Sequence, residues 1–234
     1  MTSTSPDDPA RRLSIANRIL SAHGVLDAFG HVSMRHPDRP DRFLLARNMA
    51  PAQVAPGDVL EFDLEGFSDD DRRPYLERFI HSAAYSARPD ICAVVHSHSP
   101  AIIPFTVVDT PLRPVFHMAG FLAYGVGRFE AREQIGDGSD LLVRDQATGL
   151  KLAEMLGGGA LVMMRGHGST VVGDSLEDAV YRAVYAEANA RIQAQAMGLG
   201  EVTFLDEDEG IAAAVANAGQ VRRAWDLWEQ QAGG

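Results

Sequence analysis

Hydrophobic positions along this chain change their spacing from a helical period to short alternating runs and back. Residues 8–23 place apolar side chains at helical spacing and are followed by Gly24, which predicts an amphipathic helix. Short runs bounded by Pro, Asp and Gly come next and predict strands over residues 31–35, 42–46 and 59–63. The chain therefore starts with a helix followed by a group of strands.

The rest of the chain mixes both periods. Apolar spacing predicts helices over residues 75–88, 141–156, 174–197 and the last 25, and strands over residues 91–97 and 160–164. Asp174 is the expected N-cap of the third of these helices, with Glu177 completing a capping box. The apolar side expected for the last helix consists of Val215, Val221, Trp225 and Trp228. Without a composition break or a repeat, we expect one α/β domain over residues 1–234.

Charge and composition narrow the classes of partner. The 234 residues include 21 Lys and Arg against 32 Asp and Glu, a formal net charge of -11, which argues against nucleic acid or an anionic membrane as partner. A small acidic molecule stays compatible, because a local site can be positive. The single cysteine, Cys92, indicates a reducing compartment. The N-terminus resembles no signal peptide and the most apolar stretch, residues 91–108, contains two histidines and two prolines, so we expect a cytoplasmic protein without a membrane span.

Three histidines form the sharpest chemical signal. His96 and His98 are two residues apart on a predicted strand, and strand side chains alternate between faces. Both side chains therefore project from one face roughly 7 Å apart, where both can bind one divalent ion. His167 follows another buried strand between Gly166 and Gly168. A surface pair at a strand end and an incidental histidine in a glycine turn are the alternative interpretations. Together the three predict a metal site with open positions for a substrate.

Glu77 lies on the predicted helix immediately before the strand that contains His96 and His98. Its spacing to His81 and Tyr85, four and eight residues on, puts the three side chains on one helical face. A carboxylate beside a metal can ligate the ion or act as general acid or base, whereas an exposed glutamate in a first helical turn is the simpler alternative. We expect His81 and Tyr85 to pack against the neighbouring strand.

Other polar residues are candidates for substrate contact. Gly30 precedes a strand that contains His31 and Ser33, a group that suits an anionic oxygen. Arg47, at the end of the next strand, is a better carboxylate ligand because guanidinium offers two parallel hydrogen bonds. His117 lies in an apolar stretch and is either a core histidine or a proton donor. Each of these residues is also compatible with an ordinary structural or surface position.

The motifs together resemble the class II aldolase/adducin family. The matching pieces, in the family's order, are Gly30-His-Val-Ser-Met-Arg35, Glu77-x-x-x-His81, His96-Ser-His98 and Gly166-His167-Gly, and the resemblance extends from about residue 12 to residue 196. It implies a three-layer α/β/α sandwich with a central, mainly antiparallel sheet, usually in a fourfold-symmetric tetramer. It also implies that His96, His98 and His167 bind a metal, and that Glu77 either ligates the metal when no substrate is bound or acts as acid or base.

Departures from the aldolase pattern bear on the reaction. The small hydroxyl residues that cradle a sugar phosphate are replaced here by Gly30-His31, Arg47-Asn48 and Tyr75-Leu76. This pattern is similar to the decarboxylase branch of the family, which acts on hydroxylated aromatic or heteroaromatic carboxylates. The resemblance implies a carboxy-lyase for 3-hydroxy-2-methylpyridine-4,5-dicarboxylate, of vitamin B6 degradation, or alternatively for 3,4-dihydroxyphthalate.

The expected roles follow from that resemblance. Glu77, His31 or His117 would supply the proton, and Arg47 would bind the second carboxylate, with Gly30 and Ser33 also at the substrate. Manganese(II) is the first choice of metal and zinc(II) the second. A class II aldolase or epimerase for a small hydroxy-carbonyl compound is the alternative function. A non-catalytic module of the adducin type is a third, but such modules lack the three histidines.

Overall fold

The computed structural model describes residues 8–233, so the N-terminal segment considered above, residues 1–7, and the last residue lie outside it. The helices are α1 (Pro9–Ala22), α2 (Arg78–Ala87), α3 (Ile103–Thr106), α4 (Ala131–Ile135), α5 (Gln146–Leu156), α6 (Leu176–Leu199), α7 (Glu207–Ala218) and α8 (Val221–Gln231), with 3-10 turns η1 (Pro51–Gln53), η2 (Pro56–Asp58) and η3 (His117–Tyr124). The strands are β1 (His31–Arg35), β2 (Arg42–Ala46), β3 (Val59–Asp63), β4 (Ala93–Ser97), β5 (Val126–Phe129), β6 (Leu161–Met164) and β7 (Gly168–Gly173).

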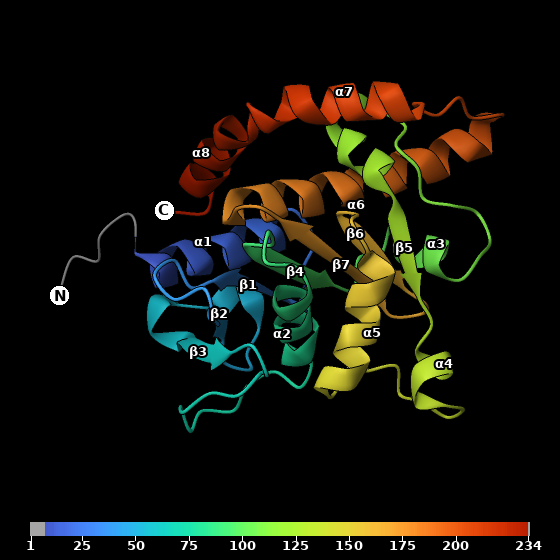
Figure 1. The fold of residues 1–234 in the computed structure, drawn as a ribbon. Coiled ribbons are helices and arrows are strands. Elements are labelled where there is room, and N and C mark those ends of the chain that lie inside the picture. The colour runs from blue at the N-terminus through green and yellow to red at the C-terminus, as the bar shows by residue number, and fades with distance from the viewer. Residues whose placement is uncertain (1–7, 234) are drawn as a thin grey trace.

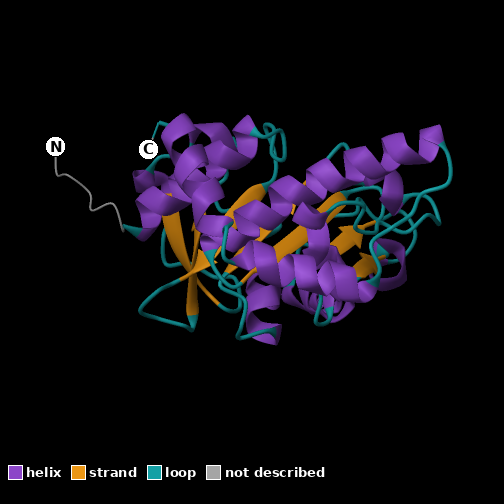
Figure 2. Ribbon diagram, turned by 90° about the horizontal axis from the view of Figure 1, so that it is seen from above, coloured by secondary structure: helices purple, strands orange, loops and turns teal. Residues whose placement is uncertain are grey.

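These strands form one sheet of seven in the order β3-β2-β1-β4-β7-β6-β5. All neighbours pair antiparallel except β5 and β6, which are parallel. Helices α1 and α6 cover one face and α2 and α5 the other, as Figures 1 and 2 show from two directions. The predicted α/β/α sandwich with a mainly antiparallel central sheet is confirmed.

Alternation along the strands divides the core into two apolar layers. In β4, Ala93 and Val95 belong to the layer under α1 and α6, whereas Val94 belongs to the layer under α2 and α5. His96 follows the same alternation as Val94. The strand in the centre of the sheet therefore directs His96 toward α2, the helix that Glu77 precedes.

The structure corrects the predicted starts of two helices. The helix expected over residues 141–156 begins only at Gln146, because the Asp145 side chain caps it by accepting a hydrogen bond from the N–H of Thr148. Helix α6 is capped by Ser175, whose hydroxyl accepts from the N–H of Asp178, and not by Asp174 with Glu177. The side chain of Glu177 pairs with Arg12 instead.

The C-terminal residues, expected as one helix, form α7 and α8 with a break at Gly219 and Gln220. The break turns α8 so that Trp225 and Trp228 are buried against α6 and α1. Val215 is on α7 and 66% exposed, so its expected place on the apolar side was wrong.

Two strands were not predicted. Strand β5, an edge strand of four residues, contains a glycine and an arginine in place of an apolar run, and β7 was hidden in a sequence that resembles a glycine turn. Of the helices within residues 8–233, none combines the length and apolar character that crossing a bilayer requires.

Candidate metal centre

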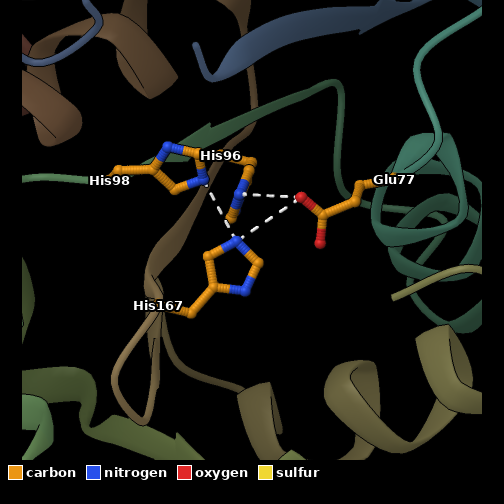
Figure 3. A group of neighbouring side chains, drawn as sticks. All are labelled: Glu77, His96, His98 and His167. Carbon is orange, nitrogen blue, oxygen red and sulfur yellow. Dashed lines mark hydrogen bonds and ion pairs between the residues drawn. The ribbon is translucent and has the colours of Figure 1, made fainter. Parts of the chain in front are cut away.

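Four side chains from separate parts of the chain meet at one end of the central strands: Glu77, His96, His98 and His167 (Figure 3). Glu77 is the residue immediately before α2, His96 lies in β4, His98 follows β4, and His167 precedes β7. One potential ligand atom from each lies within 4.8 Å of those from the others. The predicted histidines and the predicted carboxylate therefore converge.

Close backbone packing brings the two histidine segments together. A Cβ at Gly168 would lie 2.0 Å from the carbonyl oxygen of Ser97, so only glycine allows β7 to start against the end of β4. This places His167 beside His98, with 3.1 Å between their Nε2 atoms. The absence of a side chain at Gly168 therefore sets the distance between the two histidine segments.

The imidazoles present their Nε2 atoms to a common centre. The Nδ1–H of His167 donates to the carbonyl oxygen of Leu141 at 2.9 Å, which leaves its Nε2 as the lone-pair nitrogen. His96 is fully buried and its Nε2 has no hydrogen-bond partner among the described residues, at 3.6 Å from Glu77 Oε2. A buried nitrogen without a protein partner fits a metal-binding nitrogen, and three imidazoles with a carboxylate are a divalent-metal ligand set.

Electrostatics keep Glu77 as a carboxylate. Burial by itself raises its pKa, but His167 at 3.4 Å, His96, and the N–H of Val143 at 3.0 Å outweigh burial and lower that pKa to about 2. The carboxylate is therefore negative at neutral pH and faces two of the imidazoles. A buried negative charge at this position favours a cation in the centre.

The histidine pKa values support the same ligand state. Burial lowers the pKa of His96 well below its ordinary value and, more moderately, that of His98. Burial also acts to lower the pKa of His167, but its ion pair with Glu77 raises it overall. At neutral pH His96 and His98 are neutral, as metal-binding imidazoles must be.

A cavity of about 400 Å³ opens beside the cluster. Its walls are Ala28, Phe29, Gly30, His31, Asn48, Met49, Ala50, Tyr75, Leu76, Glu77, His98 and Leu142. These walls are largely apolar. Glu77 and His98 belong both to the cavity wall and to the cluster, and the wall residue His31 lies next to His96 of the cluster. The arrangement suits a small flat molecule whose polar groups point at the cluster.

The remaining predicted site residues lie at different distances from this cavity. Gly30 and His31 line it, and Gly30 has a φ of +83°. Ser33 is buried behind His31, bonded to His81. Arg47 is not a wall residue and is held at 2.8 Å by Asp58. His117 is exposed on η3 and likewise does not line the cavity.

Sequence reasoning missed the segment that supports the cluster. Leu141 accepts the hydrogen bond of His167, and Val143 donates to Glu77. Both residues fall where a helix was predicted, so no signal in the sequence pointed to them. Leu141 has a φ of +68°, the one positive φ of a non-glycine residue among those described, which turns its backbone toward the site.

Comparison with known proteins agrees with this geometry. A family model described as "Class II Aldolase and Adducin N-terminal domain" matches residues 11–194. The chain is 36% identical to the decarboxylase tropJ of Talaromyces stipitatus, over 95% of this chain and 93% of that protein. It is 29% identical to the 3,4-dihydroxyphthalate decarboxylase of Terrabacter sp., over 79% and 80% of the two chains.

Among solved structures, the L-fuculose 1-phosphate aldolase of Glaciozyma antarctica superposes with a TM-score of 0.78 at 23% identity, covering 100% of this chain and 94% of that one. At that identity the likeness shows the fold. The family match covers most of the residues that form the sheet and all four cluster residues. The chain therefore belongs to the class II aldolase and adducin family.

Proposed function

We propose that this protein is a metal-dependent decarboxylase of aromatic or heteroaromatic carboxylates that carry a hydroxyl group ortho to the carboxylate. The observation that supports this most is a cluster of three histidines and a glutamate beside a mostly apolar cavity. The similarity to two decarboxylases along most of their length supports the same reaction. The 3-hydroxy-2-methylpyridine-4,5-dicarboxylate of vitamin B6 degradation stays our first candidate substrate, ahead of 3,4-dihydroxyphthalate.

A divalent ion held by His96, His98 and His167 would supply Lewis-acid chemistry, stabilising negative charge that develops on the ortho oxygen. The chain's own residues position the substrate. Met49, Tyr75 and Leu76 offer apolar wall to an aromatic ring, and Glu77 adds a fixed negative charge next to the histidines. Manganese(II) is our first choice of ion and zinc(II) our second.

Loss of carbon dioxide requires one proton. The bond between the ring carbon and the carboxylate breaks, carbon dioxide leaves, and the electron pair that stays on the ring is taken by a proton at the same carbon. Of the three residues expected as donors, Glu77 and His31 reach the cavity, whereas His117 lies outside it. We therefore assign the reacting carbon to the space between Glu77 and His31.

Arg47 is our candidate for binding a second carboxylate. Its guanidinium is engaged with Asp58 at 2.8 Å, and its charge acts on the wall residue Tyr75, where it opposes the effect of burial on the pKa of the phenol. Arg47 directly precedes the wall residues Asn48, Met49 and Ala50 in the sequence. Binding a dicarboxylate then means that Arg47 exchanges Asp58 for the substrate.

Cleavage of a sugar phosphate is the second candidate, since solved aldolases share the fold. The wall positions next to Glu77 are Tyr75 and Leu76, which offer a bulky phenol and an apolar side chain where a phosphate would need small donors. This composition favours the aromatic carboxylate.

A substrate panel separates the two reactions. The metal-loaded protein is incubated with 3-hydroxy-2-methylpyridine-4,5-dicarboxylate, 3,4-dihydroxyphthalate and L-fuculose 1-phosphate, and both carbon dioxide and aldehyde products are measured. We expect carbon dioxide from at least one hydroxylated dicarboxylate and no aldehyde from the sugar phosphate. Aldehyde release with no carbon dioxide from either carboxylate would replace this proposal by the aldolase.

A further inference from the structure

A buried chain of hydrogen bonds runs from the cavity wall into the core. His31 Nδ1 lies 2.6 Å from His81 Nε2, and His81 Nδ1 lies 2.6 Å from Ser33 Oγ. Ser33 Oγ lies 2.7 Å from the Tyr85 hydroxyl. At most 4% of any of these four residues is exposed, and the sequence pattern had suggested only that His81 and Tyr85 pack against a strand.

Strand and helix periods build this chain. His31 and Ser33 are two residues apart on β1 and so point to the same face of the sheet. His81 and Tyr85 are four residues apart on α2 and so share the helical face that covers β1 and β4. The four polar groups alternate between strand and helix.

Counting hydrogens gives the chain a direction. The N–H of Val94 also bonds the Tyr85 hydroxyl but is a donor, so among the described residues Ser33 Oγ is the acceptor that the phenol hydrogen has. If Ser33 donated to Tyr85, that hydrogen would be buried without a partner, which costs about 1–3 kcal/mol. Tyr85 therefore donates to Ser33.

The remaining links follow from this first one. The Ser33 hydroxyl then donates to His81 Nδ1, and His81, which carries one hydrogen when neutral, donates from Nε2 to His31 Nδ1. A neutral His31 keeps its own hydrogen on Nε2. Since His31 lines the cavity, that N–H is the group it offers to a ligand.

We infer that Tyr85, Ser33 and His81 are positioning residues that fix His31 as the Nε2–H tautomer, which makes His31 a hydrogen-bond donor for a carboxylate oxygen in the cavity. The role of that oxygen in decarboxylation rests on the proposed function. A neutral imidazole that released this hydrogen would become an imidazolate, so His31 binds the carboxylate as a hydrogen-bond donor and does not supply the proton for the ring carbon.

Nitrogen-15 NMR of histidine-labelled, zinc-loaded protein tests the tautomer directly, because the two types of ring nitrogen differ strongly in chemical shift. We expect a protonated Nε2 and an unprotonated Nδ1 for His31, assigned with a His31→Gln variant. Tyr85→Phe removes the end of the chain and is expected to give a mixture of both tautomers. A protonated Nδ1 at His31 in the unaltered protein would overturn the inference.

Binding of salicylate, an ortho-hydroxy carboxylate, tests the consequence without turnover. Because only part of His31 then carries its hydrogen on Nε2, Tyr85→Phe is expected to bind salicylate more weakly by that fraction, about twofold for an equal mixture, with zinc affinity unchanged. Tyr181→Phe is the matched control, since its buried hydroxyl bonds Met118 O away from the cavity. Equal salicylate affinity in all three proteins would contradict the inference.

Failure of this inference can be distinguished from failure of the proposed function. If carbon dioxide is never released but the tautomer and the salicylate result are as expected, the reaction is wrong and the positioning chain stands. If carbon dioxide is released and His31 carries its hydrogen on Nδ1, the reaction stands and the positioning chain is wrong.

Discussion

At the scale of one residue, His96 carries the strongest argument for a metal site. Its ring is fully buried, its Nδ1 reaches Thr170 only at 3.5 Å, and its Nε2 has no hydrogen-bond partner among residues 8–233. A buried polar atom without a partner is costly, so a ligand for that atom is expected. A divalent ion satisfies it and the neighbouring negative charge of Glu77 together.

If the cluster binds a metal ion, removing one imidazole weakens that binding. We expect His96→Ala and His167→Ala to weaken zinc or manganese binding by more than about 100-fold while circular dichroism shows an unchanged fold. His117→Ala, an exposed histidine outside the cavity, is the control and should bind metal as the unaltered protein does. Calorimetric titration gives the comparison, and full metal affinity in His167→Ala would remove the argument for the site.

Arg47 offers a second prediction at this scale. If its guanidinium leaves Asp58 to bind a second carboxylate, Arg47→Met raises KM for a dicarboxylate by about tenfold and leaves KM for salicylate-type monocarboxylates within about twofold. Steady-state kinetics with the two substrate types measure this. Equal effects on both would show that Arg47 acts on the fold and not on the substrate.

At the scale of elements, helix α6 carries a buried carboxylate that is sensitive to pH. Asp178 is buried beside Arg182 at 2.9 Å, and burial raises the pKa of Asp178 from 3.8 to about 6 despite that ion pair. The folded protein thus binds this proton more tightly than the unfolded chain. The free energy of unfolding consequently falls as pH rises between those two values.

Asp178→Asn removes this dependence. Relative to the unaltered protein, the variant is expected to gain roughly 1–3 kcal/mol of stability between pH 4 and pH 8 by chemical denaturation. Asp226→Asn, an exposed carboxylate paired with Arg222 at 2.7 Å, is the control and should shift the stability by less than about 1 kcal/mol. A variant that loses stability toward pH 8 would mean that the Arg182 pair dominates.

Helix α7 depends on a glycine contact with η3. A Cβ at Gly120 would lie 2.5 Å from the carbonyl oxygen of Gly210 and 2.8 Å from the N of Ala214. Gly120→Ala is therefore expected to cost about 1–3 kcal/mol of stability. Gly198→Ala, in α6 with nothing within 4 Å of its Cβ, is the control and should gain up to about 1 kcal/mol. Thermal denaturation measures the stability of both variants. Unchanged stability in Gly120→Ala would show that α7 can move to make room for the added methyl group.

Elements with a clear period were predictable, and those fixed by distant contacts were not. The strands with His31 and His96, and the convergence of their side chains with Glu77, follow from alternation and from the family motifs. Residues 141–145 have apolar spacing typical of a helix, but the cap at Asp145 and the hydrogen bonds of Leu141 and Val143 to the site keep them out of the helix. Such contacts join residues far apart in sequence, and no local pattern encodes them.

At the scale of the whole molecule, the mainly antiparallel sheet brings the parts of the site together. Strand β4 lies between β1 and β7, so His96 is next to His31 on one side and to the segment of His167 on the other. The helix that follows Glu77 crosses the same face. A shift in the register of β4 would move His96 and His98 away from Glu77 and His167, so the pairing of β4 in the sheet fixes the geometry of the cluster.

The surface points to association of several copies. Phe29, at the cavity wall, is 66% exposed, and Leu199, at the end of α6, is 91% exposed. Exposed large apolar side chains are candidates for contact between copies. We expect a homo-oligomer, a tetramer or a multiple of it, and light scattering after size exclusion measures it. A monomer at micromolar concentration would contradict this.

The central claim is that the Glu77, His96, His98 and His167 cluster holds the ion that makes decarboxylation possible. The most direct measurement is release of carbon dioxide from an ortho-hydroxy aromatic dicarboxylate before chelation, after chelation, and after manganese(II) is restored. We predict release, loss and recovery, with no recovery in His96→Ala. Carbon dioxide release that continues undiminished in the chelated protein would contradict the claim.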